Sequence, residues 1–169
     1  MYRIRFIFII LKSLLSSKKN LSDDFELHFF VIPLIDTDFT RMFTHSYSLY
    51  MGLARWNFIF NSEFKHAALK KAWAPVTTSE IIRYKKSINA FNRVKLVTRM
   101  VHWNDRRFYL EHIFYVNNVV YNHTYIEGLV RGPQGHLRPD EVFKSLGETR
   151  DSPPLPENLQ GWVNLISIK

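Results

Sequence analysis

Side chains capable of acid–base chemistry gather just ahead of the most apolar segment of the chain. Asp36 and Asp38 are separated by one residue, and Thr44 and His45 follow shortly after them. A carboxylate or an imidazole can move a proton, and a carboxylate can also act as a nucleophile. The same residue types have structural uses, because Asp commonly caps turns and a single His is often a satisfied polar group. The four residues are candidates for a site, with turn capping as the alternative for the two aspartates.

Several other kinds of site are excluded by residue type or spacing. The chain contains no cysteine, which excludes disulfides, thiolate zinc sites, iron–sulfur clusters and a cysteine nucleophile. Its seven histidines show no paired zinc-binding spacing, and its six glycines are scattered rather than gathered in a phosphate-binding loop. We therefore expect neither a metal nor a bound cofactor.

The composition indicates one packed domain. A chain of 169 residues lies within the usual range of roughly 100–200 residues per domain. Apolar residues make up 46% of it and include 14 Phe, 8 Tyr and 4 Trp, which is enough for a core and excludes disordered and collagenous classes. The candidate residues should therefore be positioned by a folded scaffold.

A long helix, apolar on more than one face, is predicted directly after the candidates. Residues 46–60 read SYSLYMGLARWNFIF, and ten of these fifteen are apolar. Leu49 and Leu53 lie on one helical face and a second face is also apolar, so this helix must be buried on most sides. We expect Thr44 or Ser46 to cap its N-terminus.

Strands are predicted on both sides of this helix in the sequence. Segments rich in β-branched and aromatic residues, with Asn-containing turns between the last three, predict an antiparallel meander. Apolar side chains alternate along 108–116, so one face of the sheet should pack on the helix. A short helix at 139–146, ended by Gly147, and a Pro-rich stretch should follow. The predicted strands span residues 25–34, 77–88, 94–103, 108–116 and 119–130.

This order of elements resembles the hotdog fold. From about residue 25 to residue 130 the chain is similar to the thioesterase superfamily, in its 4-hydroxybenzoyl-CoA thioesterase-like branch and, within it, to the animal group called member six. The predicted fold class is therefore α+β, with a curled antiparallel sheet wrapped around a long buried helix. The resemblance is carried, in order, by PLIDTDFTRM, SYSLYMGLARW, RYKKSI, VHWNDRRFYLEHIF and PPLPENLQGW.

The resemblance implies acyl-thioester chemistry in a pocket between subunits. An acyl-CoA or another acyl thioester is the implied partner, and we predict a homodimer because a single curled sheet leaves an unpaired edge. In active relatives a carboxylate before the helix is the nucleophile or general base, and a backbone N–H at the helix start polarises the thioester carbonyl. The matching residues are Asp36 and Asp38. Asp38 fits the motif better, but the loop is about one residue short, so both stay candidates.

The sequence departs from the family pattern at the start of the helix. Relatives carry a His-Met-Asn-Asn element there, whereas this chain reads FTRMFTHS at 39–46. Thr44 and His45 are the nearby residues with proton or hydrogen-bonding chemistry. Two functions follow: hydrolysis of acyl thioesters, or a catalytically silent relative that binds acyl ligands or partner proteins.

The N-terminal 22 residues are predicted as an apolar, basic leader or anchor. Arg3 and Arg5 precede an apolar run that Lys12 interrupts, and the run is shorter than the ~20 residues a spanning helix needs. A signal peptide, an interfacial anchor, or simply a first helix or strand of the fold would fit. An active leader would direct the protein to a membrane or the secretory pathway, and otherwise we expect it in the cytoplasm. The hotdog domain should then span 23–147 and a Pro-rich strap 148–169.

The charge is concentrated in one region. Basic residues exceed acidic ones by eight, 23 against 15, which favours anionic partners. Between Arg83 and Arg107, eight basic residues accompany a single acidic one, Asp105. They could contact the phosphates of coenzyme A or RNA, but a solvated outer face of the sheet is the simpler interpretation. We do not expect nucleic acid binding.

Overall fold

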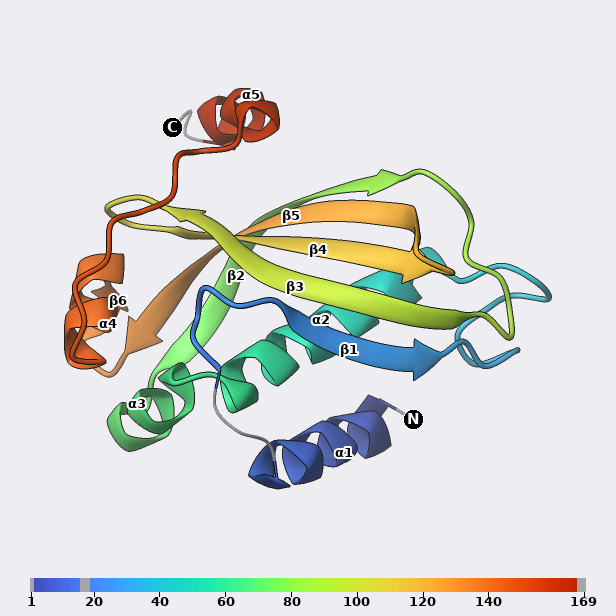
Figure 1. Cartoon of the computed structure of the whole chain (residues 1–169), viewed down its shortest axis with the longest axis horizontal. Coiled ribbons are helices and arrows are strands. Elements are labelled where there is room, and N and C mark those ends of the chain that lie inside the picture. The colour runs from blue at the N-terminus through green and yellow to red at the C-terminus, as the bar shows by residue number, and fades with distance from the viewer. Residues whose placement is uncertain (1, 16–18, 167–169) are drawn as a thin grey trace.

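One antiparallel sheet curls around helix α2 (Thr44–Asn61) at the centre of the molecule (Figure 1). The structure is a computed structural model that describes residues 2–15 and 19–166. The sheet order is β1-β3-β4-β5-β2, and β6 pairs with β5. The predicted α+β class, with a curled sheet around a long helix, is confirmed. The strands are β1 (Phe25–Phe30), β2 (Ala74–Tyr84), β3 (Arg93–Trp103), β4 (Phe108–Val116), β5 (Val119–Gly132) and β6 (Gly135–Leu137).

Helix α2 is buried because apolar side chains leave it in several directions. Tyr50, Met51 and Ala54 are almost fully buried within the main core cluster, and Phe58 packs edge-on against Phe25 of β1 at 4.7 Å. The helix predicted at 46–60 is thus confirmed, with slightly wider bounds.

The expectation that Thr44 or Ser46 caps α2 was wrong. The N-cap residue is Phe43, which makes no side-chain cap bond, and both predicted residues lie inside the first turn. The backbone sets this start, because the Phe43 N–H donates to the carbonyl of Asp36 at 2.9 Å and the Phe43 carbonyl accepts from the Ser46 N–H at 3.0 Å. The loop before the helix therefore fixes where the helix begins.

Two further helices cover this unit from opposite sides. Helix α1 (Tyr2–Leu15) lies on the side of α2 that faces away from the sheet, and α5 (Glu157–Ile166) lies on the opposite face of the sheet (Figure 1). Phe6 of α1 packs edge-on against Trp56 at 5.5 Å. On α5, Leu159 is buried and Asn158 donates to the Tyr125 hydroxyl at 2.9 Å. The molecule is therefore layered in the order α1, α2, sheet and α5.

Several predicted boundaries needed correction. Strand β1 ends at Phe30 rather than 34, because the chain turns through Pro33 and through Leu34, whose φ is 61°. Helix α3 (Phe64–Lys71) was not predicted, and the Pro-rich tail ends in helix α5, which was not predicted either. The helix predicted at 139–146 is confirmed as α4 (Pro139–Ser145).

The predicted alternation of the sheet is confirmed. His112 and Phe114 of β4 are buried toward α2. On the outer face, Lys95 lies 3.8 Å from a carboxylate oxygen of Glu26, and Arg99 forms an ion pair with Asp24 at 2.9 Å. The basic residues of β3 are therefore partly neutralised on the outer face of the sheet.

A row of polar side chains crosses the inner face of the sheet where Thr98, His112 and Thr124 are neighbours in register. All three are fully buried, and Thr98 Oγ1 lies 2.8 Å from His112 Nδ1. Burial, followed by the nearby charge of Arg55, lowers the pKa of His112 well below its ordinary value. His112 is therefore neutral inside the folded protein.

This neutral histidine predicts a loss of stability under mildly acidic conditions. The unfolded chain takes up a proton at His112 near its ordinary pKa of about 6.5, whereas the folded chain does not, so stability is present above that pH and falls below it. The midpoint of thermal unfolding should fall more for the natural protein than for His112→Gln between about pH 7.5 and about pH 5.5. An equal fall in the unfolding midpoint for both proteins would show that His112 does not contribute to this pH dependence.

Candidate active site

The loop between β1 and α2 holds both candidate aspartates in different surroundings. Hydrogen bonds from the N–H groups of Ile35 and Asp36 to the Ile32 carbonyl turn the chain, at 3.3 and 2.9 Å. Thr37 and Met42 then form an antiparallel bridge, so the residues between them project as a small hairpin. Asp36 lies at the buried base of this hairpin and Asp38 at its exposed part.

Asp36 is the most heavily engaged carboxylate of this loop. Arg5 of α1 donates to both of its oxygens, Nη1 to Oδ1 at 2.8 Å and Nη2 to Oδ2 at 2.9 Å. The Tyr50 hydroxyl and the Ile32 N–H each donate to Oδ2 at 2.9 Å. The Arg5 guanidinium also lies over the Tyr50 ring, 4.8 Å from its centroid. Asp36 therefore joins α1, α2 and the segment that follows β1.

These contacts leave Asp36 ionised but not available for reaction. Burial by itself would raise the pKa of Asp36, but the hydrogen bonds from Arg5, Ile32 and Tyr50 outweigh it and hold the pKa below its ordinary value. A carboxylate fixed by four donors, only 4% exposed, cannot approach a substrate carbonyl without breaking them. Its geometry is that of a structural ion pair.

Asp38 has the opposite character. Its side chain is exposed, and its Oδ1 accepts the N–H groups of Thr40 and Arg41, both at 2.8 Å. These two bonds, Arg41 first, lower the pKa of Asp38. Both of these hydrogen bonds end on Oδ1.

Thr44 and His45 lie at the exposed N-terminus of α2. The His45 ring stacks on the Phe43 ring, with centroids 5.0 Å apart. Thr44 and His45 thus lie in the first turn of the helix and Asp38 in the exposed loop that leads into it, whereas Asp36 is buried. In the described part of the chain, no hydrogen bond links the four candidate side chains to one another.

An apolar cavity, which the sequence did not predict, lies beside the second half of α2. Its volume is about 300 Å³, and Arg55 is the charged residue of its lining. Gly52 borders it, and a glycine within an otherwise bulky helix was the signal that could have indicated the space. The walls come from α2, the inner face of the sheet and the start of β2, and include Trp56, Ile59, Met100, Leu110, Ile126 and Val76.

The cavity and the candidate carboxylate lie toward different ends of α2. Gly52 lies eight positions after Thr44, which corresponds to about 12 Å along a helix. Within one chain, a group bound in the cavity and the Asp38 carboxylate are therefore well apart. The cavity instead lies next to edge strand β2, most of whose residues are exposed.

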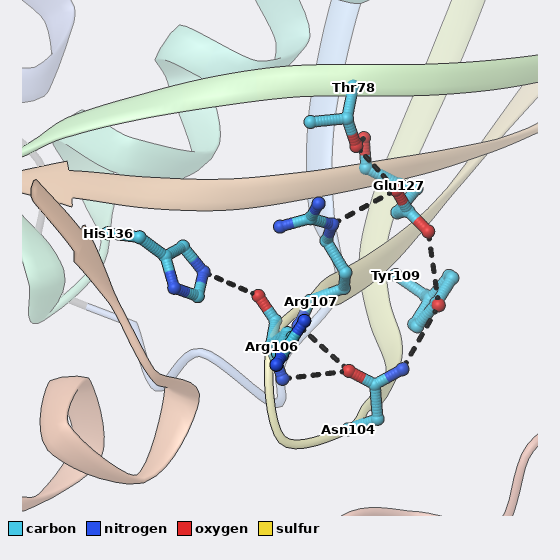
Figure 2. A network of polar contacts seen from close by, with 7 residues as sticks. All are labelled: Thr78, Asn104, Arg106, Arg107, Tyr109, Glu127 and His136. Carbon is cyan, nitrogen blue, oxygen red and sulfur yellow. Dashed lines mark hydrogen bonds and ion pairs between the residues drawn. The ribbon is translucent and has the colours of Figure 1, made fainter. Parts of the chain in front are cut away.

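A second polar cluster occupies the outer face of the sheet (Figure 2). Oε1 of Glu127 accepts from Thr78 Oγ1 at 2.6 Å and from Arg107 Nε at 3.2 Å, and Oε2 accepts from the Tyr109 hydroxyl at 3.2 Å. Burial, followed by the charge of Glu127, raises the pKa of Tyr109 to about 12. Asn104 continues the network into the turn between β3 and β4. These polar groups satisfy one another and hold the turn, so we assign the cluster a structural role.

Comparison with known families supports the resemblance expected from the sequence. A model of the thioesterase-like superfamily matches residues 32–163. The chain is 23% identical over 171 residues to Protein THEM6 of Drosophila melanogaster, which covers 99% of this chain and 86% of that protein. It is 30% identical over 95 residues to Protein THEM6 of Danio rerio, which covers 54% of this chain and 45% of that protein. The resemblance to member six is confirmed.

Solved structures show the same fold. A probable thioesterase from Escherichia coli, YbaW, matches with a TM-score of 0.66 and 16% identity, covering 72% of this chain and 96% of that one. The gentisyl-coenzyme A thioesterase BH1999 matches with a TM-score of 0.59 and 19% identity, covering 73% and 99%. Protein SAV2348 of Staphylococcus aureus, solved in complex with CoA, matches with a TM-score of 0.65 and 12% identity, covering 85% and 96%. The predicted hotdog fold is confirmed.

The Arg5–Asp36 contact predicts that α1 contributes to stability. Asp36→Asn leaves the largely buried Arg5 guanidinium without its counter-charge and should lower the free energy of unfolding by roughly 1–3 kcal/mol. Denaturant unfolding of the two single variants, Arg5→Met and Asp36→Asn, and of the double variant gives the coupling between them. The double variant should cost at least about 1 kcal/mol less than the sum of the single variants.

Arg3→Met is the matched control, because Arg3 is an exposed arginine of the same helix. It should leave the unfolding free energy within about 0.5 kcal/mol of the natural value. If Arg5→Met were equally silent, α1 would not be an integral part of the fold in solution.

Proposed function

Because the chain belongs to the thioesterase-like superfamily, we propose that it hydrolyses fatty acyl thioesters of coenzyme A. The observation that carries this proposal is the apolar cavity between α2 and the sheet, which suits an acyl group. Two relatives of the same fold are described as a CoA-ester thioesterase and as a complex with CoA, which favours CoA as the thiol carrier here.

We assign the reacting carboxylate to Asp38. Asp36 is held by Arg5 and Tyr50, whereas Asp38 is ionised and exposed. Asp38 would either attack the thioester carbonyl or take a proton from a water molecule that attacks it. The N–H groups at the N-terminus of α2 would stabilise the negative charge that forms on the carbonyl oxygen. The C–S bond then breaks, and the CoA thiolate leaves and is protonated. With Asp38 as general base the free fatty acid is released directly; with Asp38 as nucleophile, water hydrolyses the acyl–carboxylate anhydride, which releases the fatty acid and restores the carboxylate.

A homodimer would bring this carboxylate to the cavity. Strand β2 pairs with β5 on one side, and its exposed residues include Val76, Ile81 and Tyr84. If two copies joined antiparallel along β2, their α2 helices would run in opposite directions. The N-terminus of the partner's α2 would then approach the cavity beside Gly52 and Arg55, which removes the separation of about 12 Å within one chain.

The alternative is a catalytically silent relative that binds acyl ligands. It is favoured by the lack of hydrogen bonds among Asp38, Thr44 and His45 in the described part of the chain. A binding protein needs the cavity but not the carboxylate, so the two functions can be separated by variants of each.

Turnover of acyl-CoA should depend on Asp38. The purified natural protein should release free CoA from medium- and long-chain acyl-CoA, and Asp38→Asn should reduce kcat at least about 100-fold because the general base or nucleophile is lost. Asp105→Asn, an exposed aspartate in the turn between β3 and β4, should behave like the natural protein. Thiol release is followed with a chromogenic thiol reagent.

Gly52→Leu separates binding from chemistry in the same assay. Gly52 lines the cavity, so a leucine there should narrow it and lower acyl-CoA binding, and thermal unfolding of the variant checks that the fold is kept. Gly161→Leu, a helical glycine with open space around it, is the control. Equal turnover by the natural protein and Asp38→Asn would contradict the role of Asp38, and binding without turnover by the natural protein would favour the silent alternative.

Association through β2 should be visible in solution. Light scattering at micromolar concentration should give the mass of a dimer for the natural chain. Ile81→Lys should shift the measured mass toward that of the monomer, because each copy would carry a positive charge on the β2 edge through which the two copies pair. Leu69→Lys, an exposed leucine of α3, should stay dimeric. A strictly monomeric natural protein would contradict the pocket between subunits.

A further inference from the structure

Helix α1 has two apolar faces, of which only one is used by the fold. On the inner face, Ile9 is buried in the main core, Phe6 contacts Trp56, and Arg5 is bonded to Asp36. On the outer face, Ile4, Ile7, Phe8 and Leu11 are between 55% and 68% exposed.

The four exposed side chains form one stripe. Their spacing of three, four and seven residues from Ile4 places them on the same side of an α-helix. Single exposed apolar residues are ordinary in proteins, but a contiguous row of large ones usually marks a surface that binds something. The inner face of α1 already accounts for its place in the fold, so the outer stripe needs a separate explanation.

The charges around the stripe indicate what it binds. The first 22 residues contain five basic residues and no acidic one. Arg5 is neutralised by Asp36, while Arg3 and Lys19 are exposed. Apolar side chains flanked by basic ones match the hydrocarbon and the anionic headgroups of a lipid surface.

A second copy of this helix fits the stripe less well. Two α1 helices packed stripe to stripe would bring basic residues together without acidic partners. Four side chains on a helix of 14 residues also offer much less than the ~800 Å² per partner that a stable protein interface buries.

A spanning orientation does not fit α1 either. Its 14 residues extend about 21 Å, less than the ~30 Å hydrocarbon core of a bilayer. Within residues 2–15 and 19–166, no helix has both the length and the apolar character needed to cross a membrane. Spanning would also require the Arg5–Asp36 contact to break.

We propose that α1 lies flat on an anionic membrane, with Ile4, Ile7, Phe8 and Leu11 in the lipid interface and its inner face still docked on α2. The sequence left two alternatives for this segment, a membrane anchor and a first helix of the fold. In this proposal α1 is both. The sheet and α5 face away from the bilayer, because α5 lies across the sheet from α1 (Figure 1).

Vesicle co-sedimentation of the full chain tests this proposal. The natural protein should sediment with vesicles of phosphatidylcholine and phosphatidylserine, and less with phosphatidylcholine alone or at raised salt. Ile7→Glu combined with Phe8→Glu should weaken binding to the anionic vesicles at least about tenfold. Leu165→Glu is the matched control, because Leu165 is 66% exposed on α5, and it should bind like the natural protein.

The thermal stability and the solution mass of the variants complete the test. Both substituted side chains are exposed, so the midpoint of thermal unfolding of the double variant should stay close to the natural value. If the double variant does unfold, the milder Phe8→Ser is measured in its place, and it should weaken vesicle binding several-fold. Failure of the natural protein to bind anionic vesicles, or equal binding by the stripe variant, overturns the proposal. Unchanged vesicle binding with a loss of dimer mass would instead assign the stripe to a second copy.

Discussion

The ion pair between Arg5 and Asp36 is the constraint on which the arrangement of the chemical groups depends. A buried carboxylate must be paired and hydrogen-bonded, and Asp36 obtains its partners from α1, α2 and the segment after β1 at once. This contact fixes the loop that starts α2, docks α1 and orients its outer face. It also removes Asp36 from reaction and leaves Asp38 as the accessible carboxylate of the loop.

The hotdog arrangement explains why the cavity and the loop are apart. Helix α2 is enclosed by the sheet on one side and by α1 on the other, and the open space remains beside its second half, next to β2. A single chain therefore holds the place for an acyl group and the place for a carboxylate toward different ends of one helix. In the proposed dimer, antiparallel helices would bring each carboxylate to the cavity of the other copy.

The most extensive polar clusters of this protein are structural. Glu127, Tyr109 and their neighbours satisfy one another on the outer face of the sheet (Figure 2), and the inner row around His112 is fully buried. Buried polar groups require partners, so they gather whether or not they react. In this family member, exposure distinguishes Asp38 better than the size of a cluster does.

The sequence by itself determined the central helix, the main strands of the sheet and the family. The apolar pattern of α2, the alternation along β4 and the five ordered motifs are local features, and each can be read within a short stretch of chain. The tertiary structure decided which aspartate is buried, because Arg5 lies 31 residues before Asp36. It also decided that α1 is docked and that the tail ends in a helix. These outcomes depend on contacts between distant residues and on space left between layers, neither of which has a periodic signature in the sequence.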